Sequence, residues 1–418
     1  MRRILLADAD AFFVAVARSV DPEGAGRAPL LIVGGRPGSR GVVCSASYET
    51  RAFGVRSAMP ISQALRLCPD AMCVPVPRNA CADTSRAIRR VLDRFTPAVE
   101  GASIDEWYLD LSGTEALYHD EPFADTARRI RQAVLSDTGM SVSIGGGPNK
   151  LIAKLAAERA KPSRSPAAGG VHVVDEGEVM AFMQTVALAD IPGIGPKLQA
   201  MLASVGLVTV EDVLPHDPST LGRWIGAGTA ARLHERVRGV SESGVEPRAP
   251  ARQMSREETF DRDIVHQERL LGELRHLAAR VGADLRGEGL AARTVTVKLK
   301  DKDFTTRSAG RTLPEPVESD RAISDVAEQL LARLRAQRTV AARLVGVALS
   351  NFSRARDAEQ LAMFGGALEP ADVPERARDR DLSRAMDRVR ARFGDDAIRT
   401  GPARRSPIGE KGARKPRD

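Results

Sequence analysis

The sequence predicts a multidomain α/β (α+β) protein. Three observations lead to this prediction: its length, its composition and its alternation of strand-like and helix-like segments. The chain has 418 residues, which at roughly 150 residues per domain corresponds to two or three globular units. Hydrophobic residues make up 43% and charged residues 28%, ordinary proportions that exclude a wholly disordered chain. Because aromatic residues are only 4%, the cores must be built mainly from Ala, Val, Leu and Ile.

Residues 1–165 interleave the two kinds of segment. Short apolar runs predict buried strands, and residues 123–138 have the apolar spacing of an amphipathic helix. Residues 98–111 predict two strands that meet around 103–106, and Asn149 is a suitable N-cap for a helix that follows it. Strands interleaved with helices in this way predict an α/β or α+β domain.

The rest of the chain divides into segments of different character. Residues 176–240 are helical in pattern, with repeated glycine breaks, and the polar, proline-containing stretch 241–250 is the best candidate for a linker. A second α/β unit is expected over 251–352. A helix is expected at 380–393, and residues 401–418 are expected to be disordered.

The net charge points only weakly to a polyanionic partner. Lys and Arg number 62 against 55 Asp and Glu, a net charge of +7. Residues 401–418 hold six basic residues against two acidic ones, so more than half of the surplus lies in this tail. The overall charge is therefore weak evidence for nucleic-acid binding.

The sequence lacks the signals of membrane proteins, of secreted proteins and of several enzyme classes. No apolar run reaches the roughly 18 residues that cross a bilayer, and Asp8 comes too early for a signal peptide. The four cysteines lack paired CxxC spacing, which argues against a zinc site. We therefore expect a cytoplasmic protein with reduced thiols and no membrane association. The chain has no GxxxxGK[ST], HExxH or GxSxG motif, so the residues of P-loop ATPases, zinc proteases and serine hydrolases are missing.

Three acidic residues stand out by their placement. Asp8 ends a hydrophobic strand, and Asp105 and Glu106 lie between two strand halves. Converging carboxylates form the kind of oxygen-rich site that holds Mg²⁺, and two such ions can activate a hydroxyl and neutralise a leaving pyrophosphate. Neighbouring strand residues point to opposite faces, so Asp105 and Glu106 need a turn or bulge to act together. On spacing alone, a polar hairpin tip explains this pair equally well.

Four blocks of sequence resemble one known family. Residues 103–110 read SIDEWYLD, which closely resembles the SIDEAYLD signature of Y-family DNA polymerases, the translesion enzymes of the bacterial DinB (polymerase IV) branch. Residues 8–13, DADAFF, resemble that branch's DMDAFF opening, and residues 46–60 resemble its ASYEARKFGVRSAMP block. Residues 149–162 match its NK…AK…KP helix. These blocks keep the family's order and spacing.

The resemblance implies a right-hand polymerase fold and a defined activity. The expected activity is DNA-directed DNA polymerisation of low fidelity for translesion synthesis. A primer 3′-hydroxyl would attack a dNTP and release pyrophosphate, without proofreading, in a monomeric protein. The expected domains are a ferredoxin-like palm (1–10 and 77–166), small fingers (11–76), a helical thumb with a helix-hairpin-helix (167–240), a linker (241–250), an α/β little finger (251–354), and a clamp-binding peptide with a largely disordered basic tail (355–418).

The resemblance also implies a set of active-site residues. Asp8, Asp105 and Glu106, with the backbone carbonyl of Ala9, would hold two Mg²⁺ ions, for which Mn²⁺ can substitute, and Glu106 is the acid usually assigned as catalytic. Phe13 holds the position of the steric gate that excludes a ribonucleotide 2′-hydroxyl. The other expected contacts to the dNTP are Phe12, Ser45, Tyr48, Arg51 and Lys161.

These nucleotide contacts have ordinary structural explanations as well. Tyr48 fits a core tyrosine, Arg51 a surface arginine and Lys161 a lysine at a helix end. A core phenylalanine explains Phe12 better than Phe13. Taken together, however, the residues match the cationic clamps that phosphoryl transfer requires.

Two regions are expected to contact DNA. The sequence PGIGPK at 192–197 resembles the hairpin of a helix-hairpin-helix, where Gly193, Gly195 and Lys197 would approach a phosphate. In the strand 294–302, apolar residues alternate with Thr and Lys. This pattern predicts a basic sheet face that tracks the DNA backbone, although a solvated face explains it too. The expected contacts are Lys298, Lys300, Arg307 and Arg311.

A short motif predicts a protein partner. Residues 360–364, QLAMF, resemble the QLxLF peptide by which bacterial polymerases bind the sliding clamp. The expected clamp-binding residues are Gln360, Leu361, Met363 and Phe364.

Several features depart from the family pattern, and rival functions stay open. Ala17 stands where a glutamate is common, and Trp107 stands where the family has a small residue beside the acids. GGGP at 145–148 replaces the usual GIAxN, and residues 163–168 lengthen a loop. A non-catalytic family member that recruits another polymerase is one rival, although such members are expected to lack the acids. The other rivals are a helix-hairpin-helix accessory protein and a nucleotidyl cyclase with a similar palm.

Overall fold

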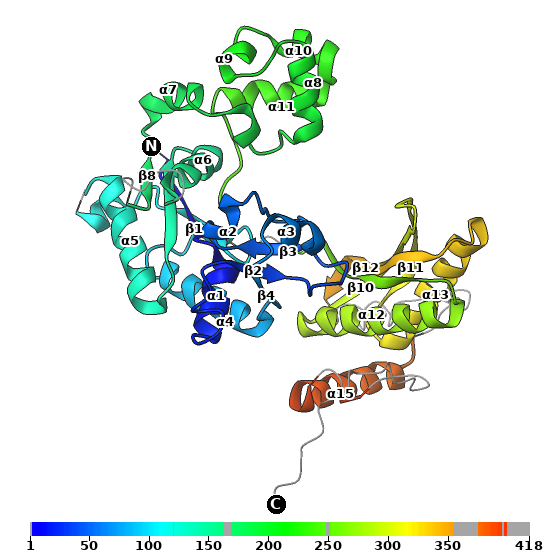
Figure 1. Ribbon diagram of the computed structural model, residues 1–418. Coiled ribbons are helices and arrows are strands. Elements are labelled where there is room, and N and C mark those ends of the chain that lie inside the picture. The colour runs from blue at the N-terminus through cyan, green and yellow to red at the C-terminus, as the bar shows by residue number, and fades with distance from the viewer. Residues whose placement is uncertain are drawn as a thin grey trace, which may run out of the picture. The chain divides into compact units, whose positions relative to one another are not determined.

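The structure is a computed structural model that describes residues 2–119, 121–162, 169–247, 251–354, 375–394 and 397–398. The chain divides into two compact units, Met1–Ala249 and Pro250–Asp418, and Figure 1 labels their elements. Within the described residues, no helix is both long and apolar enough to span a membrane.

A five-stranded sheet forms the centre of the first unit. Its order is β5-β6-β1-β7-β8, and β1 pairs antiparallel with both β6 and β7, whereas β7 and β8 are parallel. All six residues of β1 are buried, as expected for a central strand covered on both faces. The strands are β1 (Ile4–Ala9), β5 (Val99–Gly101), β6 (Glu106–Asp110), β7 (Val142–Gly147) and β8 (Val171–Val173).

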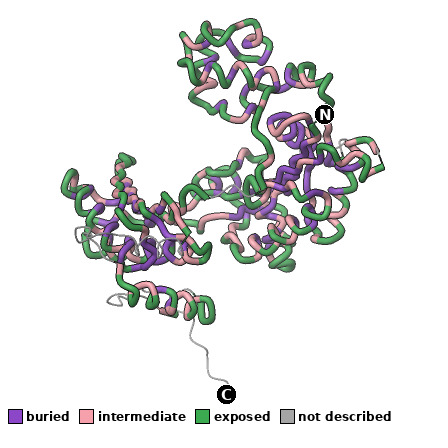
Figure 2. The backbone as a smooth tube through the Cα atoms, turned by 180° about the vertical axis from the view of Figure 1, so that it is seen from behind, coloured by how far each residue is buried: buried purple, intermediate pink, exposed green. Residues whose placement is uncertain are grey.

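Helices cover both faces of this sheet. Leu5, Ala7 and Ala9 of β1 belong to a core shared with α1, α4 and α5. Ile4 and Leu6 point the other way and pack on α6, because successive strand residues alternate between faces. Figure 2 shows these buried segments in purple. The helices are α1 (Phe12–Val20), α4 (Arg78–Leu92), α5 (Phe123–Thr138) and α6 (Lys150–Ala160).

Helix α6 packs unusually close to the sheet. A Cβ atom added to Gly145 in β7 would lie 2.0 Å from the backbone nitrogen of Ala157 and 2.1 Å from the carbonyl oxygen of Ala153. Only glycine permits this approach. Asn149 is the helix N-cap and its side chain accepts a hydrogen bond from the Ile152 N–H. Gly145, which the usual GIAxN pattern also has, therefore sets the depth at which α6 lies.

A small second sheet and a helical region complete the first unit. The small sheet has the order β3-β2-β4. In the helical region, Gly193 has φ +87° at the turn before α8, a conformation that favours glycine. The small sheet and its helices are β2 (Leu31–Gly34), β3 (Val43–Ala46), α2 (Tyr48–Ala52), α3 (Ile61–Leu67) and β4 (Met72–Val74). The helical region holds α7 (Val179–Gln184), α8 (Pro196–Ser204), α9 (Val210–Val213), α10 (Pro218–Ile225) and α11 (Ala227–Val237).

The described part of the expected linker lies against the central sheet. The Lys150 ammonium donates to the Glu100 carboxylate at 2.7 and 2.8 Å and to the Gly244 carbonyl at 3.2 Å. Glu100 also accepts a hydrogen bond from the Glu246 N–H at 2.6 Å. Gly244 and Glu246 are thus held by Lys150 of α6 and Glu100 of β5.

The second unit is a four-stranded antiparallel sheet covered on one face by two helices. Its order is β11-β10-β12-β9. Val295, Val297 and Leu299 of β10 face the helices and are fully buried, which confirms the alternation expected for this strand. The elements are β9 (Gln253–Ile264), α12 (Gln267–Gly287), β10 (Leu290–Asp301), β11 (Thr306–Val317), α13 (Asp320–Gln337) and β12 (Ala342–Arg354).

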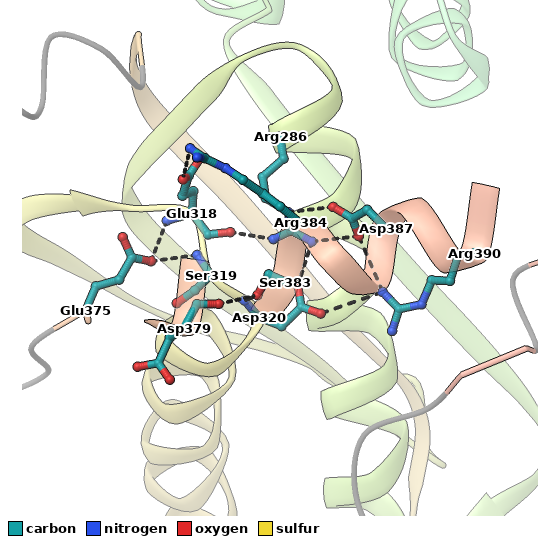
Figure 3. A network of polar contacts seen from close by, with 10 residues as sticks. All are labelled: Arg286, Glu318, Ser319, Asp320, Glu375, Asp379, Ser383, Arg384, Asp387 and Arg390. Carbon is teal, nitrogen blue, oxygen red and sulfur yellow. Dashed lines mark hydrogen bonds and ion pairs between the residues drawn. The ribbon is translucent and has the colours of Figure 1, made fainter. Parts of the chain in front are cut away.

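A further helix, α15 (Ala377–Phe393), packs on α12 and α13 through a polar network (Figure 3). The Arg286 guanidinium of α12, whose side chain is 4% exposed, donates to Asp387 of α15 at 2.7 and 3.0 Å. It also donates to Asp320 of α13 at 2.8 Å. Glu375 accepts the backbone N–H groups of Glu318 and Ser319 at 2.9 and 2.6 Å. The network fixes α15 at the start of α13.

Removal of the Asp387 carboxylate should destabilise the second unit. In Asp387→Ala the buried Arg286 guanidinium loses two of its acceptors, so we expect the free energy of unfolding to fall by about 2 kcal/mol. Denaturant unfolding followed by circular dichroism measures this loss. The matched control is Asp381→Ala on the exposed side of the same helix, which should change stability by less than about 0.5 kcal/mol. Equal effects of the two substitutions would show that the network does not hold α15.

Candidate active site

Asp8 and Glu106 lie opposite each other at the end of two paired strands. Asp8 of β1 and Glu106 of β6 are direct partners in the antiparallel register, so their side chains point to the same face of the sheet. That face is the one covered by α6, as the packing of Leu6 and Tyr108 on this helix shows. The two carboxylates are therefore neighbours, as expected.

Asp105 lies in a turn whose backbone adjoins this pair. Residues 102–105 form bends between β5 and β6, and the Asp105 carbonyl accepts the Ala9 N–H at 2.9 Å. The Asp105 carboxylate hydrogen-bonds the Ser103 hydroxyl. Asp105 and Glu106 were expected to need a turn in order to act together. This turn is present and lies beside Ala9.

Two lysines, Lys154 of α6 and Lys161 at the C-cap of this helix, neutralise the carboxylates. The Lys161 ammonium lies 2.9 Å from an Asp8 oxygen and also contacts Glu158. The Lys154 ammonium binds both Glu106 oxygens at 2.7 and 2.8 Å. Lys154 lies inside α6 and Lys161 directly follows its last residue, Ala160, so both reach the carboxylates from the same segment of the chain.

Burial is costly for the Asp8 carboxylate. Desolvation raises the pKa of Asp8 to about 6, the charge of Lys161 opposes this rise, and the charge of Glu106 adds to it. Burial alone would lower the pKa of Lys161, but its contacts with Asp8 and Glu158 raise it. The two pKa shifts have a common origin, because the buried Asp8 carboxylate and the Lys161 ammonium stabilise each other's charged form.

The donor set fits a divalent cation. Asp8, Glu106 and the turn that carries Asp105 offer hard oxygen ligands. Burial raises the pKa of Asp8, so a cation beside it stabilises the charged carboxylate. The lysines hold the carboxylates in this structure, and within its described residues no three acidic, His or Cys side chains are grouped closely enough to enclose an ion. Binding of a cation would therefore require rearrangement of the lysine contacts.

The two phenylalanines of α1 have different environments. Phe12 is 2% exposed and belongs to the core under the central sheet. This agrees with the core position that the sequence favoured for Phe12, and its expected contact with a dNTP stays a prediction. Phe13 is half-buried, packs its ring edge-on to Phe12 at 5.5 Å between centroids, and also borders the small sheet. Its position is compatible with the expected gate.

The expected phosphate-binding residues converge from two segments. The charges of Asp10, Arg51, Lys161 and Asp8 all act on the pKa of Tyr48, which burial raises. Tyr48 and Arg51 of α2 therefore lie near the carboxylate end of the central sheet. The Arg51 guanidinium stacks 4.9 Å from the Tyr48 ring centroid and donates to the Ala46 carbonyl at 2.9 Å. Ser45 is buried in β3.

Three residues at this site had no role expected from the sequence. Lys154 and Glu158 are the ion-pair partners described above, and their spacing from Lys161 on α6 was a readable signal. Asp10 accepts the hydroxyl groups of Ser141 and Ser143 at 2.6 and 2.7 Å. These bonds join the turn after β1 to β7, and only the fold reveals them.

Trp107 points away from the acids. It is 2% exposed and belongs to the core on the face opposite Glu106, since neighbouring strand residues alternate. This departure from the family pattern therefore alters the core under the sheet rather than the site itself. The longer loop at 163–168 lies outside the described residues.

The expected hairpin of a helix-hairpin-helix has the anticipated form. Gly195 is the N-cap of α8, Pro196 is its first residue and Lys197 is exposed. Gly193 has a positive φ, and the Arg236 guanidinium of α11 donates to the Pro192 carbonyl beneath it. The turn is thus stabilised from inside, and its outer side is accessible.

The four basic residues expected to contact DNA from the second sheet lie on two different faces. Lys298 and Lys300 lie on the face opposite the helices, but Arg307 and Arg311 pair with Leu299 and Val295 in the register and so face the helices. Arg307 binds the buried Asp301 at 3.1 Å, and Arg311 donates to Gln329 of α13 at 2.8 Å. The two arginines therefore lie on the other face from Lys298 and Lys300, and their expected contacts with DNA stay a prediction.

The open face is flat and mostly polar. Lys298 forms an ion pair with Glu257 at 2.9 Å. Apart from Leu344 opposite Lys300 and Glu257 beside Gly346, the register places mostly small side chains around the two lysines: Thr294, Thr296, Thr306, Ser308, Gly310, Thr312, Gly346, Ala348, Ser350 and Ser255. The predicted clamp-binding residues Gln360, Leu361, Met363 and Phe364 lie outside the described residues.

Family models and curated proteins match most of the chain. The model of the impB/mucB/samB family matches residues 7–158, and the model of its C-terminal domain matches residues 251–363. A DNA polymerase IV of Caulobacter vibrioides is 36% identical over 95% of this chain and 93% of its own length. A DNA polymerase IV of Xanthomonas euvesicatoria pv. vesicatoria is 35% identical over 89% of this chain and 100% of its own.

Solved structures agree with these matches. A Y-family DNA polymerase chimera, Dbh-Dpo4(243-245)-Dbh, has a TM-score of 0.74 at 26% identity and covers 84% of this chain and 98% of its own. An insertion ternary complex of Dbh DNA polymerase has a TM-score of 0.60 at 27% identity, with the same coverage. The expected fold class and polymerase activity are confirmed, and the scaffold alternative is not favoured. The chain therefore belongs to the impB/mucB/samB family and is a Y-family, DNA-directed DNA polymerase of the translesion type.

Proposed function

We propose that this polymerase adds dNTPs to a primer through a two-metal site built from Asp8, Asp105, Glu106 and the Ala9 carbonyl. The observation that carries the proposal is the pairing of Asp8 with Glu106 across two strands, with Asp105 in the adjoining turn. Two Mg²⁺ ions, or Mn²⁺ in their place, would supply activation of the primer 3′-hydroxyl and charge neutralisation on the leaving pyrophosphate.

The lysines of α6 prepare the site for this charge. Lys154 and Lys161 hold the two carboxylates in position through the contacts at 2.7 to 2.9 Å. Lys161 already shares its ammonium between Asp8 and Glu158. It can therefore turn from Asp8 to an incoming triphosphate while Glu158 still anchors it. Such a cationic clamp positions the phosphates and lowers their repulsion of an attacking oxygen.

The fingers side of the site would bind the rest of the nucleotide. Tyr48 and Arg51 are held together by ring stacking, and their position near Lys161 suits a second contact to the triphosphate. Ser45 is a weaker candidate because it is buried. Phe13 would lie against the sugar, where its ring leaves no room for a 2′-hydroxyl.

Primer-template DNA would be bound by both units. In the first unit, Gly193, Gly195 and Lys197 offer backbone N–H groups and a cation at the N-terminus of α8, a helix of nine residues. In the second, small side chains around Lys298 and Lys300 let a phosphate backbone approach the sheet closely. Residues 360–364 would bind a sliding clamp, and the polymerase would act as a monomer in the cytoplasm.

The proposal is tested by extension of a labelled primer on a DNA template with Mg²⁺ and dNTPs. Asp105→Ala should reduce extension by at least about a hundredfold, because loss of a charged ligand removes transition-state stabilisation of this order. The matched control is Asp83→Ala, an exposed carboxylate on α4, which should extend normally. Wild-type rates in Asp105→Ala would contradict the two-metal assignment.

The sugar gate is tested by the ratio of dNTP to rNTP incorporation. Phe13→Ala removes the ring and should lower this ratio by at least about tenfold, since a bulky contact that excludes a hydroxyl is worth 1–3 kcal/mol in such pockets. Single-nucleotide incorporation under steady-state conditions gives both rates, and the dNTP rate controls for general damage. An unchanged ratio with normal dNTP incorporation would remove Phe13 from the gate.

A further inference from the structure

The hairpin between β10 and β11 presents an aromatic ring to solvent. Phe304 is 62% exposed and has φ +67°. A bulky residue with this backbone conformation is a rare outlier. Strained and exposed large side chains of this kind concentrate at functional sites, where binding rather than folding accounts for the residue.

The turn itself calls for glycine. The Phe304 N–H donates to the Asp301 carbonyl at 2.9 Å, and the Asp301 N–H donates to the Thr305 carbonyl at 2.9 Å. In hairpins closed in this way, a tight turn is followed by one left-handed residue, and glycine or asparagine usually fills that position. The hairpin would thus be more stable with a smaller residue at 304.

The base of the hairpin is rigid. The Asp301 side chain is fully buried and accepts hydrogen bonds from Arg307 and Arg338 at 3.1 Å. Arg338 also binds Asp303 at 2.6 Å. Ordering of the ring position therefore costs little entropy on binding, because the backbone that carries it is already fixed.

Two cations lie over the ring, which still leaves Phe304 largely exposed. The Arg343 guanidinium carbon lies 4.5 Å from the Phe304 ring centroid, and the Lys300 ammonium lies 6.0 Å from it. Arg343 is the extra residue in the irregularity between the Lys300–Leu344 and Asp301–Ala342 pairs of β10 and β12. Bulges of this kind redirect a side chain. The tip thus combines an exposed aromatic ring with positive charge.

We propose that Phe304 is a stacking platform for an unpaired nucleobase of single-stranded DNA, with Lys300 and Arg343 beside it as contacts to the adjoining phosphates. Stacking on an aromatic ring accepts any base and is the usual way to hold single strands. In a duplex the base faces are already stacked and covered. This inference rests on the proposed function, because it takes the template strand as the ligand.

The surroundings of Phe304 favour nucleic acid over a protein partner. The residues that adjoin it in the hairpin are Lys302, Asp303, Thr305 and Thr306, all exposed and polar. A protein-docking patch would need further apolar side chains beside the ring. The hairpin also continues into the open face of the sheet, on which Lys298 and Lys300 lie.

The test uses the full-length protein and two probes at one fixed salt concentration, a labelled oligothymidylate and a blunt duplex. In Phe304→Ala the affinity for the oligothymidylate should fall by about 5- to 100-fold, the equivalent of one stacked base. The affinity for the duplex should stay within about twofold. Fluorescence anisotropy titrations measure both constants.

Three variants separate stacking from folding. Phe304→Trp should bind the oligothymidylate as well as the wild type. Phe304→Gly should lose affinity while its thermal stability equals or exceeds that of the wild type, because strain is relieved. The matched control is Phe393→Ala on α15, which removes a ring that is 68% exposed and lies 5.3 Å from the Arg392 guanidinium carbon. It should leave binding unchanged.

Several outcomes would overturn the inference. If Phe304→Ala binds the oligothymidylate with an affinity within twofold of the wild type, Phe304 is not a stacking platform. An equal loss on the duplex shows a general contact rather than a single-strand site. An equal loss in Phe393→Ala shows a non-specific effect. Primer extension by wild type and Asp105→Ala decides the proposed function separately, so failure of one is distinguishable from failure of the other.

Discussion

The contact between α6 and the central sheet is the constraint on which the active site depends. Gly145 removes the side chain that would hold the helix away, and the backbone of α6 lies against β7 as a result. At this depth, Lys154 and Lys161 reach Glu106 and Asp8. A bulkier residue at 145 would push the helix outward and leave buried carboxylates without cations, a costly arrangement in a region of low dielectric.

The same contact explains why the site can accept further charge. Asp8 is buried enough for its pKa to rise to about 6, so its charge at neutral pH depends on the cation beside it. Lysine supplies that cation through a flexible chain that has a second acceptor in Glu158. The lysine contacts therefore position the carboxylates but can be broken by side-chain motion alone. A metal ion can then take the place of a lysine at a carboxylate, and the lysine can bind a phosphate.

Much of the fold was predictable because strand alternation and helix caps are local signals. The helix at 123–138, the Asn149 cap and the turn before Glu106 all follow from short-range pattern. The direction in which Arg307 and Arg311 point, and the docking of α15 through Arg286, could not be predicted in this way. These depend on register and on contacts between segments distant in sequence, such as the pairing of Arg307 with Leu299. A charge count along the chain cannot contain that information.

The measurement that tests the central claim most directly is Mn²⁺ binding to the wild type, Asp8→Asn and Lys154→Met, followed by electron paramagnetic resonance. If the α6 lysines occupy carboxylates that otherwise bind metal, Asp8→Asn should bind Mn²⁺ at least about tenfold more weakly, and Lys154→Met should bind it more tightly than the wild type. Equal affinity in all three proteins, or weaker binding in Lys154→Met, would contradict the account.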